Sequence, residues 1–179
     1  MIRRELESKL LEMAEKFPVV SVTGPRQSGK TTLLRESFPD YTYTSLEDPD
    51  TRIIAGEDPR SFLGMSERMV IDEIQRVPEL FSYIQTITDK TGISGQFIIS
   101  GSQSFLLNKD IAQSLAGRVA VLRLLPFSYS ELLEGRIKFG SYEELLYKGF
   151  YPRIYDKGIS PLDFFPSYIQ TYIERDLRL

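Results

Sequence analysis

Residues 24–31 read GPRQSGKT and match the pattern G-x-x-x-x-G-K-[ST] at every defined position. A short run rich in β-branched residues, Val19 to Val22, precedes the stretch, and a helical pattern runs from about Thr31 to Phe38. A loop of this kind between a strand and a helix turns successive backbone N–H groups toward a phosphate. This context favours a phosphate-binding loop over a Gly-containing turn with a surface lysine.

The end of this stretch has chemistry suited to a nucleoside triphosphate. Gly29 leaves room for the backbone to approach phosphate oxygens, Lys30 adds a positive charge against the β- and γ-phosphates, and the Thr31 hydroxyl is a hard oxygen ligand for Mg²⁺. The dipole of the following helix favours the same anion. The predicted nucleotide contacts here are Gly24, Pro25, Arg26, Gln27, Ser28, Gly29, Lys30, Thr31 and Thr32.

An acidic pair follows further along the chain. Met69 to Ile71 form a compact apolar run, typical of a buried strand, that ends at Asp72 and Glu73. Such a strand can bring Asp72 beside the phosphate loop, where Asp72 and Thr31 would hold Mg²⁺. We expect Glu73 to orient and deprotonate the attacking water. The simpler alternative is a strand that ends in solvent.

Three further polar positions are candidates for the same site. Ser100 and Ser102 follow the apolar run Phe97 to Ile99, and either hydroxyl would sense the γ-phosphate if this strand lies between the other two; a turn or helix cap is the alternative. Arg118 precedes another apolar run. It would stabilise the transferring phosphoryl group from the same chain or a neighbouring subunit, or else form a structural salt bridge.

Short apolar runs alternate with helical patterns, which predicts an α/β fold with a mostly parallel sheet. The expected strands cover 19–22, 41–46, 68–71, 97–99 and 119–124, and the expected helices cover 2–17, 31–38, 80–87 and a stretch before Leu115. Residues 47–62 contain two Asp-Pro steps and are expected to form a loop with a short helix.

The pattern changes after Pro126, so we expect a nucleotide-binding core over 1–126, including the N-terminal helix, and a helical extension over 127–179. The extension is expected to hold short helices over 131–133 and 142–146, a loop over 149–152, and a last helix with Phe165, Tyr168, Ile169 and Tyr172 on one face. It resembles the start of a lid or of a linker to a further domain.

The composition excludes several kinds of chemistry. The 179 residues include no His and no Cys, so disulfides, thiolate nucleophiles, imidazole relays and the zinc sites built from them are excluded. The net charge of −3 gives no overall attraction for nucleic acid. No apolar run is long enough to span a membrane, and the N-terminus lacks the apolar core of a signal peptide, so we expect a cytoplasmic protein.

The base of the nucleotide is expected to be adenine. Guanine recognition would need Asn-Lys-x-Asp, whereas this chain has Asn108-Lys109-Asp110, which is one residue short and does not follow a strand. The predicted ligands are therefore ATP or ADP together with Mg²⁺.

With these residues in place, the chain resembles a prokaryotic AAA+-type ATPase, of the family whose ATPase core precedes a C-terminal domain of unknown function. The matching segments are GPRQSGKTT (24–32), SLEDPD (45–50), EDPRSFL (57–63), VIDEIQRVPEL (70–80), FIISGSQSFLL (97–107), SLAGRVAVLRLLPFS (114–128), GFYP (149–152) and YIQTYIERD (168–176). The segments containing DEIQRVPEL and SLAGR are more specific to the family than the phosphate loop.

The resemblance implies a P-loop three-layer αβα sandwich with a five-stranded sheet in the order 5-1-4-3-2. It also implies the roles given above for Lys30, Thr31, Asp72 and Glu73, and it strengthens a catalytic role for Arg118. Members are usually longer than this chain, so we expect a C-terminal domain to follow Leu179. The apolar face of the last helix would then pack partly on that missing domain, or else it covers the ATPase core itself.

Two classes of function are compatible with these observations. The first is an ATPase, slow in isolation, that couples hydrolysis to a conformational change in a second domain or in an unknown protein or nucleic-acid partner, with homo-oligomerisation possible. The second is a nucleotide-dependent binding switch with negligible hydrolysis. A small-molecule kinase is less favoured, because Asp72 and Glu73 suit water as the acceptor.

Overall fold

A computed structural model describes residues 2–101 and 115–173 of the chain. The chain divides into two compact units, one formed by residues 5–25 and 30–124 and the other by residues 1–4, 26–29 and 125–179. The division differs from the expected ranges 1–126 and 127–179, because residues 1–4 and 26–29 group with the C-terminal part of the chain. The expected domain ranges stay a prediction. Within the described residues, no helix is long and apolar enough to cross a membrane.

The first unit is built on a five-stranded sheet in the order β2-β3-β4-β1-β5. The strands are β1 (Val19–Thr23), β2 (Thr42–Ser45), β3 (Met69–Asp72), β4 (Phe97–Gly101) and β5 (Val119–Arg123). All four neighbouring pairs are parallel. The α/β fold and the strand order are therefore confirmed. Because parallel neighbours need crossover connections, helices come to lie on both faces.

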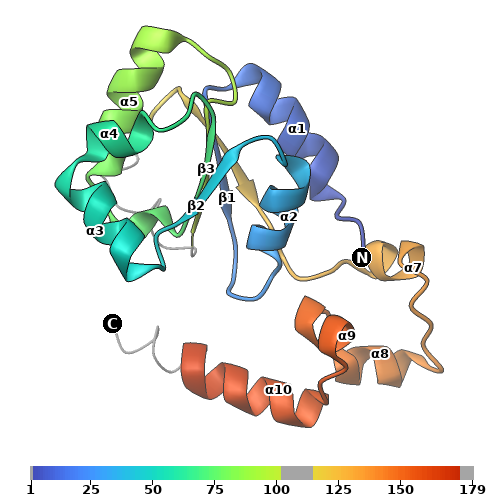
Figure 1. The fold of residues 1–179 in the computed structure, drawn as a ribbon. Coiled ribbons are helices and arrows are strands. Elements are labelled where there is room, and N and C mark those ends of the chain that lie inside the picture. Colours follow the sequence, from blue (N-terminus) through green and yellow to red (C-terminus); the bar gives the residue numbers. More distant parts are fainter. Residues whose placement is uncertain (1, 102–114, 174–179) are drawn as a thin grey trace. The chain divides into compact units, whose positions relative to one another are not determined.

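Helices α1 (Leu6–Lys16) and α2 (Lys30–Ser37) cover one face, and α3 (Pro49–Glu57), α4 (Pro59–Leu63) and α5 (Leu80–Thr91) cover the other (Figure 1). The central strands are buried on both sides, since alternate residues serve opposite faces. Val20, Val70 and Ile98 pack with α1 and α2. The neighbouring residues of the same strands, among them Ile71 and Ile99, pack with α3, α4 and α5.

The prediction of a loop with one short helix over 47–62 is wrong, because α3 and α4 fill most of this range. Each Asp-Pro step starts a helix. The Asp48 side chain accepts from Asp50 N and Thr51 N, and the Asp58 side chain accepts from Ser61 N at 3.0 Å. Proline is well suited to the first helical position, where its missing N–H has no partner to lose.

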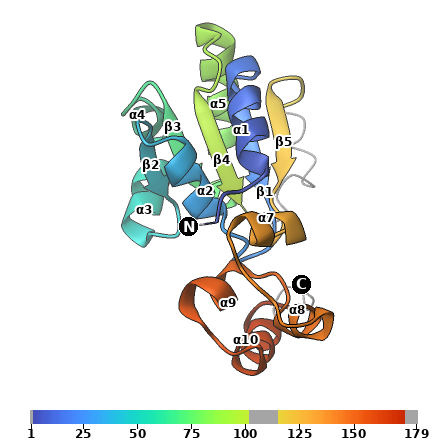
Figure 2. The same cartoon turned by 90° about the vertical axis from the view of Figure 1, so that its right-hand side faces the viewer.

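The second unit holds short helices, which are drawn in orange and red (Figure 2). They are α7 (Tyr129–Glu134), α8 (Tyr142–Lys148), α9 (Pro152–Lys157), α10 (Pro161–Tyr168) and a π-helical turn, η3 (Ile169–Ile173). Helix α9 begins at the last residue of the expected loop. In the last apolar stretch, Tyr168 is buried and packs within its own unit against Tyr151 and Phe164, whereas Ile169 is 46% exposed.

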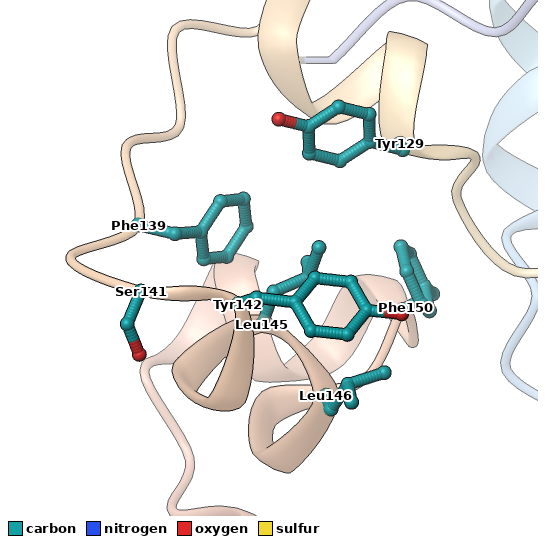
Figure 3. A pocket seen from close by; sticks show the side chains of 7 residues that line it. All are labelled: Tyr129, Phe139, Ser141, Tyr142, Leu145, Leu146 and Phe150. Carbon is teal, nitrogen blue, oxygen red and sulfur yellow. The ribbon is translucent and has the colours of Figure 1, made fainter.

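A cavity of about 690 Å³ opens between α7, α8 and the segments beside them. Figure 3 shows that the ring of Tyr129 faces those of Phe139 and Tyr142 across it. The lining residues are Tyr129, Phe139, Ser141, Tyr142, Leu145, Leu146 and Phe150. It is mainly an apolar hollow, and none of its lining residues belongs to the phosphate loop.

Candidate nucleotide site

The carboxyl ends of β1, β3 and β4 meet at one edge of the sheet, because these strands are parallel and β4 lies between the other two. The phosphate loop follows β1, Asp72 is the last residue of β3, and Ser100 is the next-to-last residue of β4. Residues that are far apart in the sequence are therefore brought to one place. Ligands of open α/β sheets bind at this carboxyl edge.

The Asp72 carboxylate is the centre of a buried polar network in the first unit, with 4% of the residue exposed. The Thr31 hydroxyl donates to Oδ2 at 2.7 Å, and the Ser100 hydroxyl donates to Oδ1. The Glu73 N–H donates to Oδ1 at 3.1 Å, and the Tyr43 hydroxyl donates to Oδ2 at 2.8 Å. Both carboxylate oxygens thus have two donors, which makes this buried anion tolerable.

Tyr43 is a site residue that sequence analysis did not identify. Burial and the hydrogen bond to Asp72 raise the pKa of Tyr43 to about 12, so the phenol remains a donor near neutral pH. The Arg35 guanidinium lies over its ring, 3.9 Å from the centroid. Tyr43 lies in an expected strand, but the sequence did not show that this strand, β2, pairs with β3, and only that pairing brings Tyr43 close to Asp72.

Lys30 begins α2 and is 6% exposed. Its Nζ donates to the carbonyl oxygens of Gly24 and Pro25, at 3.0 Å each. The ammonium is therefore directed back over the first residues of the loop. A positive charge held there, at a helix N-terminus, is placed to meet an anion.

The loop backbone adopts conformations with positive φ at three positions, Gly24, Gln27 and Gly29. At Gly29, where φ is +95°, a Cβ atom would lie 3.2 Å from the Arg4 guanidinium. Both the conformation and the lack of space explain why glycine occupies this position. Ser28 is fully buried, Arg26 is half-buried, and Thr32 is exposed on α2.

Glu73 follows Asp72 in a left-handed backbone conformation, with φ 57° and ψ 43°. Its carboxylate is partly exposed and accepts a hydrogen bond from the side-chain amide of Gln75. Because of this left-handed backbone conformation, the Glu73 side chain does not follow the alternation of the preceding strand. The two carboxylates therefore have different partners, although they are adjacent in the sequence.

The donors at this edge suit Mg²⁺. The hydroxyl of Thr31 and the carboxylate of Asp72 are hard oxygens already in contact with each other. Over residues 2–101 and 115–173, no group of three or more Asp or Glu side chains could hold a metal by itself. Mg²⁺ commonly takes only one or two protein ligands and completes its shell with phosphates and water.

Arg118 is not brought to this edge. It precedes β5, whose Val119 is in register with Val19, so Arg118 lies at the amino end of the sheet. Arg118 is therefore level with residue 18, six residues before Gly24 along the neighbouring strand, which corresponds to roughly 20 Å. Its guanidinium forms an ion pair with Asp89, with Nη2 2.9 Å from Oδ2, and lowers the pKa of that carboxyl. A contact with the phosphates of its own loop is thereby excluded. Ser102, the other serine proposed as a sensor, lies outside the described residues.

Comparison with known proteins agrees with this geometry. Residues 16–133 match the sequence profile of a family described as AAA domain. An uncharacterized protein of Mycobacterium tuberculosis is 34% identical over 98% of this chain, and one of Methanocaldococcus jannaschii is 30% identical over 75% of it. The chain spans only 40% and 31% of the lengths of these relatives.

Two solved structures share the fold. The Walker-type ATPase of Pyrococcus abyssi superposes with a TM-score of 0.60 at 16% identity, covering 99% of this chain and 75% of that one. The DnaA protein of Aquifex aeolicus, in a structure with bound AMPPCP, gives 0.58 at 16% identity, covering 96% and 64%.

Proposed function

Because the chain belongs to the AAA domain family, we propose that it binds ATP with Mg²⁺, hydrolyses it, and couples hydrolysis to a conformational change in a partner or second domain. The observation that carries the proposal is the Asp72 carboxylate, which joins the end of the phosphate loop to two other strands through Thr31, Ser100 and Tyr43. A phosphate or metal ion bound at the loop would therefore act on the Asp72 carboxylate through Thr31.

The phosphates would be held by the loop amides and by Lys30. The contacts of Lys30 Nζ with two loop carbonyls leave its charge at the mouth of the loop, where a triphosphate would exchange these contacts for phosphate oxygens. The loop residues Gly24, Pro25, Arg26, Gln27, Ser28 and Gly29, with Thr31 and Thr32, are the proposed nucleotide contacts.

Thr31 and Asp72 are the proposed ligands of Mg²⁺. When bound, the ion would neutralise charge on the β- and γ-phosphates. Ser100 contacts the same carboxylate from β4, so a change at the γ-phosphate would be transmitted to it through Asp72. Ser100 is therefore the proposed sensor residue.

Glu73 is the proposed general base. Its carboxylate has to exchange the Gln75 amide for a water molecule in line with the γ-phosphate. Replacing Glu73 by Gln removes the basic oxygen and keeps the size and the backbone. We expect Glu73→Gln to bind ATP like the wild type and to release no phosphate above background, as measured by phosphate release at saturating ATP. Undiminished turnover in this variant would disprove the role of Glu73.

A nucleotide-dependent switch with negligible hydrolysis is the second candidate. The contact between Glu73 and Gln75 favours it, because the proposed base is occupied in this arrangement. Gln75→Ala separates the two candidates. An ATPase restrained by this contact would hydrolyse faster in the variant, whereas a switch that does not hydrolyse would show no phosphate release in either protein.

The partner is proposed from the lengths of the relatives. Since the matched region is 40% of the mycobacterial protein, most of that protein lies outside it, and the second domain that we propose as the partner would belong to such a remainder. A second copy of the chain is the other proposed partner, and Arg118 would then act on the nucleotide of a neighbour.

A further inference from the structure

Arg4 contacts the phosphate loop although it lies 24 residues before Ser28 in the sequence. Its Nη1 donates to the Ser28 carbonyl oxygen at 2.7 Å. Arg4, Ser28 and residues 125–131 all belong to the second unit. The Arg4 side chain is only 9% exposed, which is unusual for an arginine and requires partners for its charge.

Those partners hold the guanidinium from several sides. Nε donates to Glu131 Oε1 at 3.0 Å, and Nη2 donates to the carbonyl oxygen of Leu125 at 2.6 Å and, more weakly, to that of Pro126 at 3.4 Å. The guanidinium also lies over the ring of Phe127, 4.9 Å from its centroid. A planar group with several donors in a fixed fork can make these contacts together, whereas an ammonium group cannot.

Glu131 is itself fixed, with a side chain only 4% exposed. Its second oxygen accepts from the Ser128 N–H at 2.8 Å, and its own N–H donates to the Ser128 hydroxyl, which forms a capping box at the start of α7. Arg4 therefore connects the phosphate loop to a well-ordered helix start.

The contact with Ser28 determines the direction of a loop amide. The Ser28 carbonyl and the Gly29 N–H belong to one planar trans peptide group, and the two point in opposite directions. While Arg4 holds the carbonyl, the Gly29 N–H has to point away from Arg4. Gly29 also packs against the guanidinium, because a Cβ at this position would lie 3.2 Å from Nη1.

We propose that Arg4 is a positioning residue of the phosphate loop: it orients the Gly29 N–H toward the bound phosphate and connects the loop to the start of α7. This inference rests on the proposed function. It assigns to a residue outside the sequence motif the task of keeping the motif in its binding conformation. The connection to α7 also gives the phosphate loop a route to the C-terminal helices.

The test compares the affinity for Mg·ATP of the wild type with that of Arg4→Lys and Arg4→Gln, by calorimetric titration of protein shown to be folded by circular dichroism. Arg4→Lys keeps the charge opposite Glu131 and is the variant chosen to remain folded. We expect both variants to bind ATP about tenfold more weakly, the loss expected for one charge-assisted hydrogen bond. Glu131→Gln, which leaves the Ser28 contact, should lose less.

Two control variants separate positioning from general stability. Ile84→Ala removes a fully buried side chain from the cluster between α5 and the sheet of the first unit, which holds neither Arg4 nor Phe127, and should lower the melting temperature without weakening ATP binding. Lys9→Gln removes an exposed charge on α1 that pairs only on the surface. If the folded Arg4 variants bind ATP as tightly as the wild type and these controls, Arg4 does not position the loop.

The proposed function and this inference can fail separately. If the wild type and Lys30→Ala both fail to bind ATP, the proposed function is wrong and the inference is wrong with it. If the wild type binds, Lys30→Ala does not, and Arg4→Lys binds normally, only the inference is wrong.

Discussion

At the scale of single residues, the hydrogen bonds of the candidate site converge on one buried carboxylate. Asp72 has donors on both oxygens from four places in the chain, and Thr31 and Ser100 are two of them. The sequence motifs predicted that Thr31, at the end of the phosphate loop, and Asp72, at the end of a strand, would lie together, and that Ser100 would join them if its strand lay between the other two. Their roles in catalysis stay predictions.

Tyr43 and Arg4 could not be predicted in the same way. The contact between Tyr43 and Asp72 depends on which strand lies beside β3, and short apolar runs do not specify their neighbours. Arg4 lies in the stretch 2–17 that was expected to be one helix, but α1 begins only at Leu6, so Arg4 is free of the helix and its contact with Ser28 could not be predicted from the periodic pattern. The spacing of sequence motifs predicts which motif residues meet at the site, but it does not predict contacts from residues outside the motifs, such as Tyr43 and Arg4.

The raised pKa of Tyr43 gives a prediction about pH. Its value of about 12 in the folded chain exceeds the ordinary value of 10.0. The stabilisation from the neutral phenol is therefore complete below pH 10 and is lost as the pH rises from 10 toward 12. The difference in tyrosinate absorbance between the wild type and Tyr43→Phe should titrate with a midpoint near 12. An ordinary tyrosine midpoint would contradict the burial and the Asp72 contact.

At the scale of elements, the strands were easier to predict than the helix starts. Apolar runs over 19–22, 68–71 and 97–99 became β1, β3 and β4 with small changes at their ends. In contrast, the Asp-Pro steps at residues 48–49 and 58–59 were interpreted as loop, although both begin helices. A proline in the interior of a helix breaks it, whereas a proline in the first turn favours it. An Asp-Pro step can therefore be interpreted from the sequence either as a loop or as a helix start.

The capping box of α7 can be tested by one substitution. Ser128→Ala removes the hydroxyl that accepts from the Glu131 N–H at 3.0 Å. We expect the free energy of unfolding to fall by about 1 kcal/mol, as for other N-cap serines. Urea denaturation would measure this loss. A stability equal to that of the wild type would show that α7 does not need its cap.

At the scale of the whole molecule, the sheet of the first unit is stabilised from both faces. Ile98 on β4 is fully buried and packs with α1 and α2. Ile98→Ala should lower the free energy of unfolding by about 2–5 kcal/mol, because it removes buried methyl groups and leaves a cavity. Val121→Ala on β5 is the control, since Val121 is 54% exposed and should change the stability little. Equal effects in urea denaturation would argue against this account of the core.

The position of Arg118 gives a prediction about assembly. It lies at the amino end of the sheet, paired with Asp89, so it cannot serve the nucleotide of its own chain. Arg118→Ala should leave the turnover of monomeric protein unchanged and lower it at concentrations where copies associate. Phosphate release measured over a range of protein concentrations, with the mass followed by light scattering, would check this. A loss of turnover in the monomer would contradict the geometry.

The central claim is that Mg·ATP binds at the phosphate loop through Lys30 and the oxygens of Thr31 and Asp72. Calorimetric titration with ATP, with Mg²⁺ present or chelated, tests it most directly on the wild type, Lys30→Ala and Asp72→Asn. We predict binding of one ATP per wild-type chain, strong loss of affinity in Lys30→Ala, and loss of the Mg²⁺ dependence in Asp72→Asn. Equal affinity in the wild type and Lys30→Ala would contradict the claim.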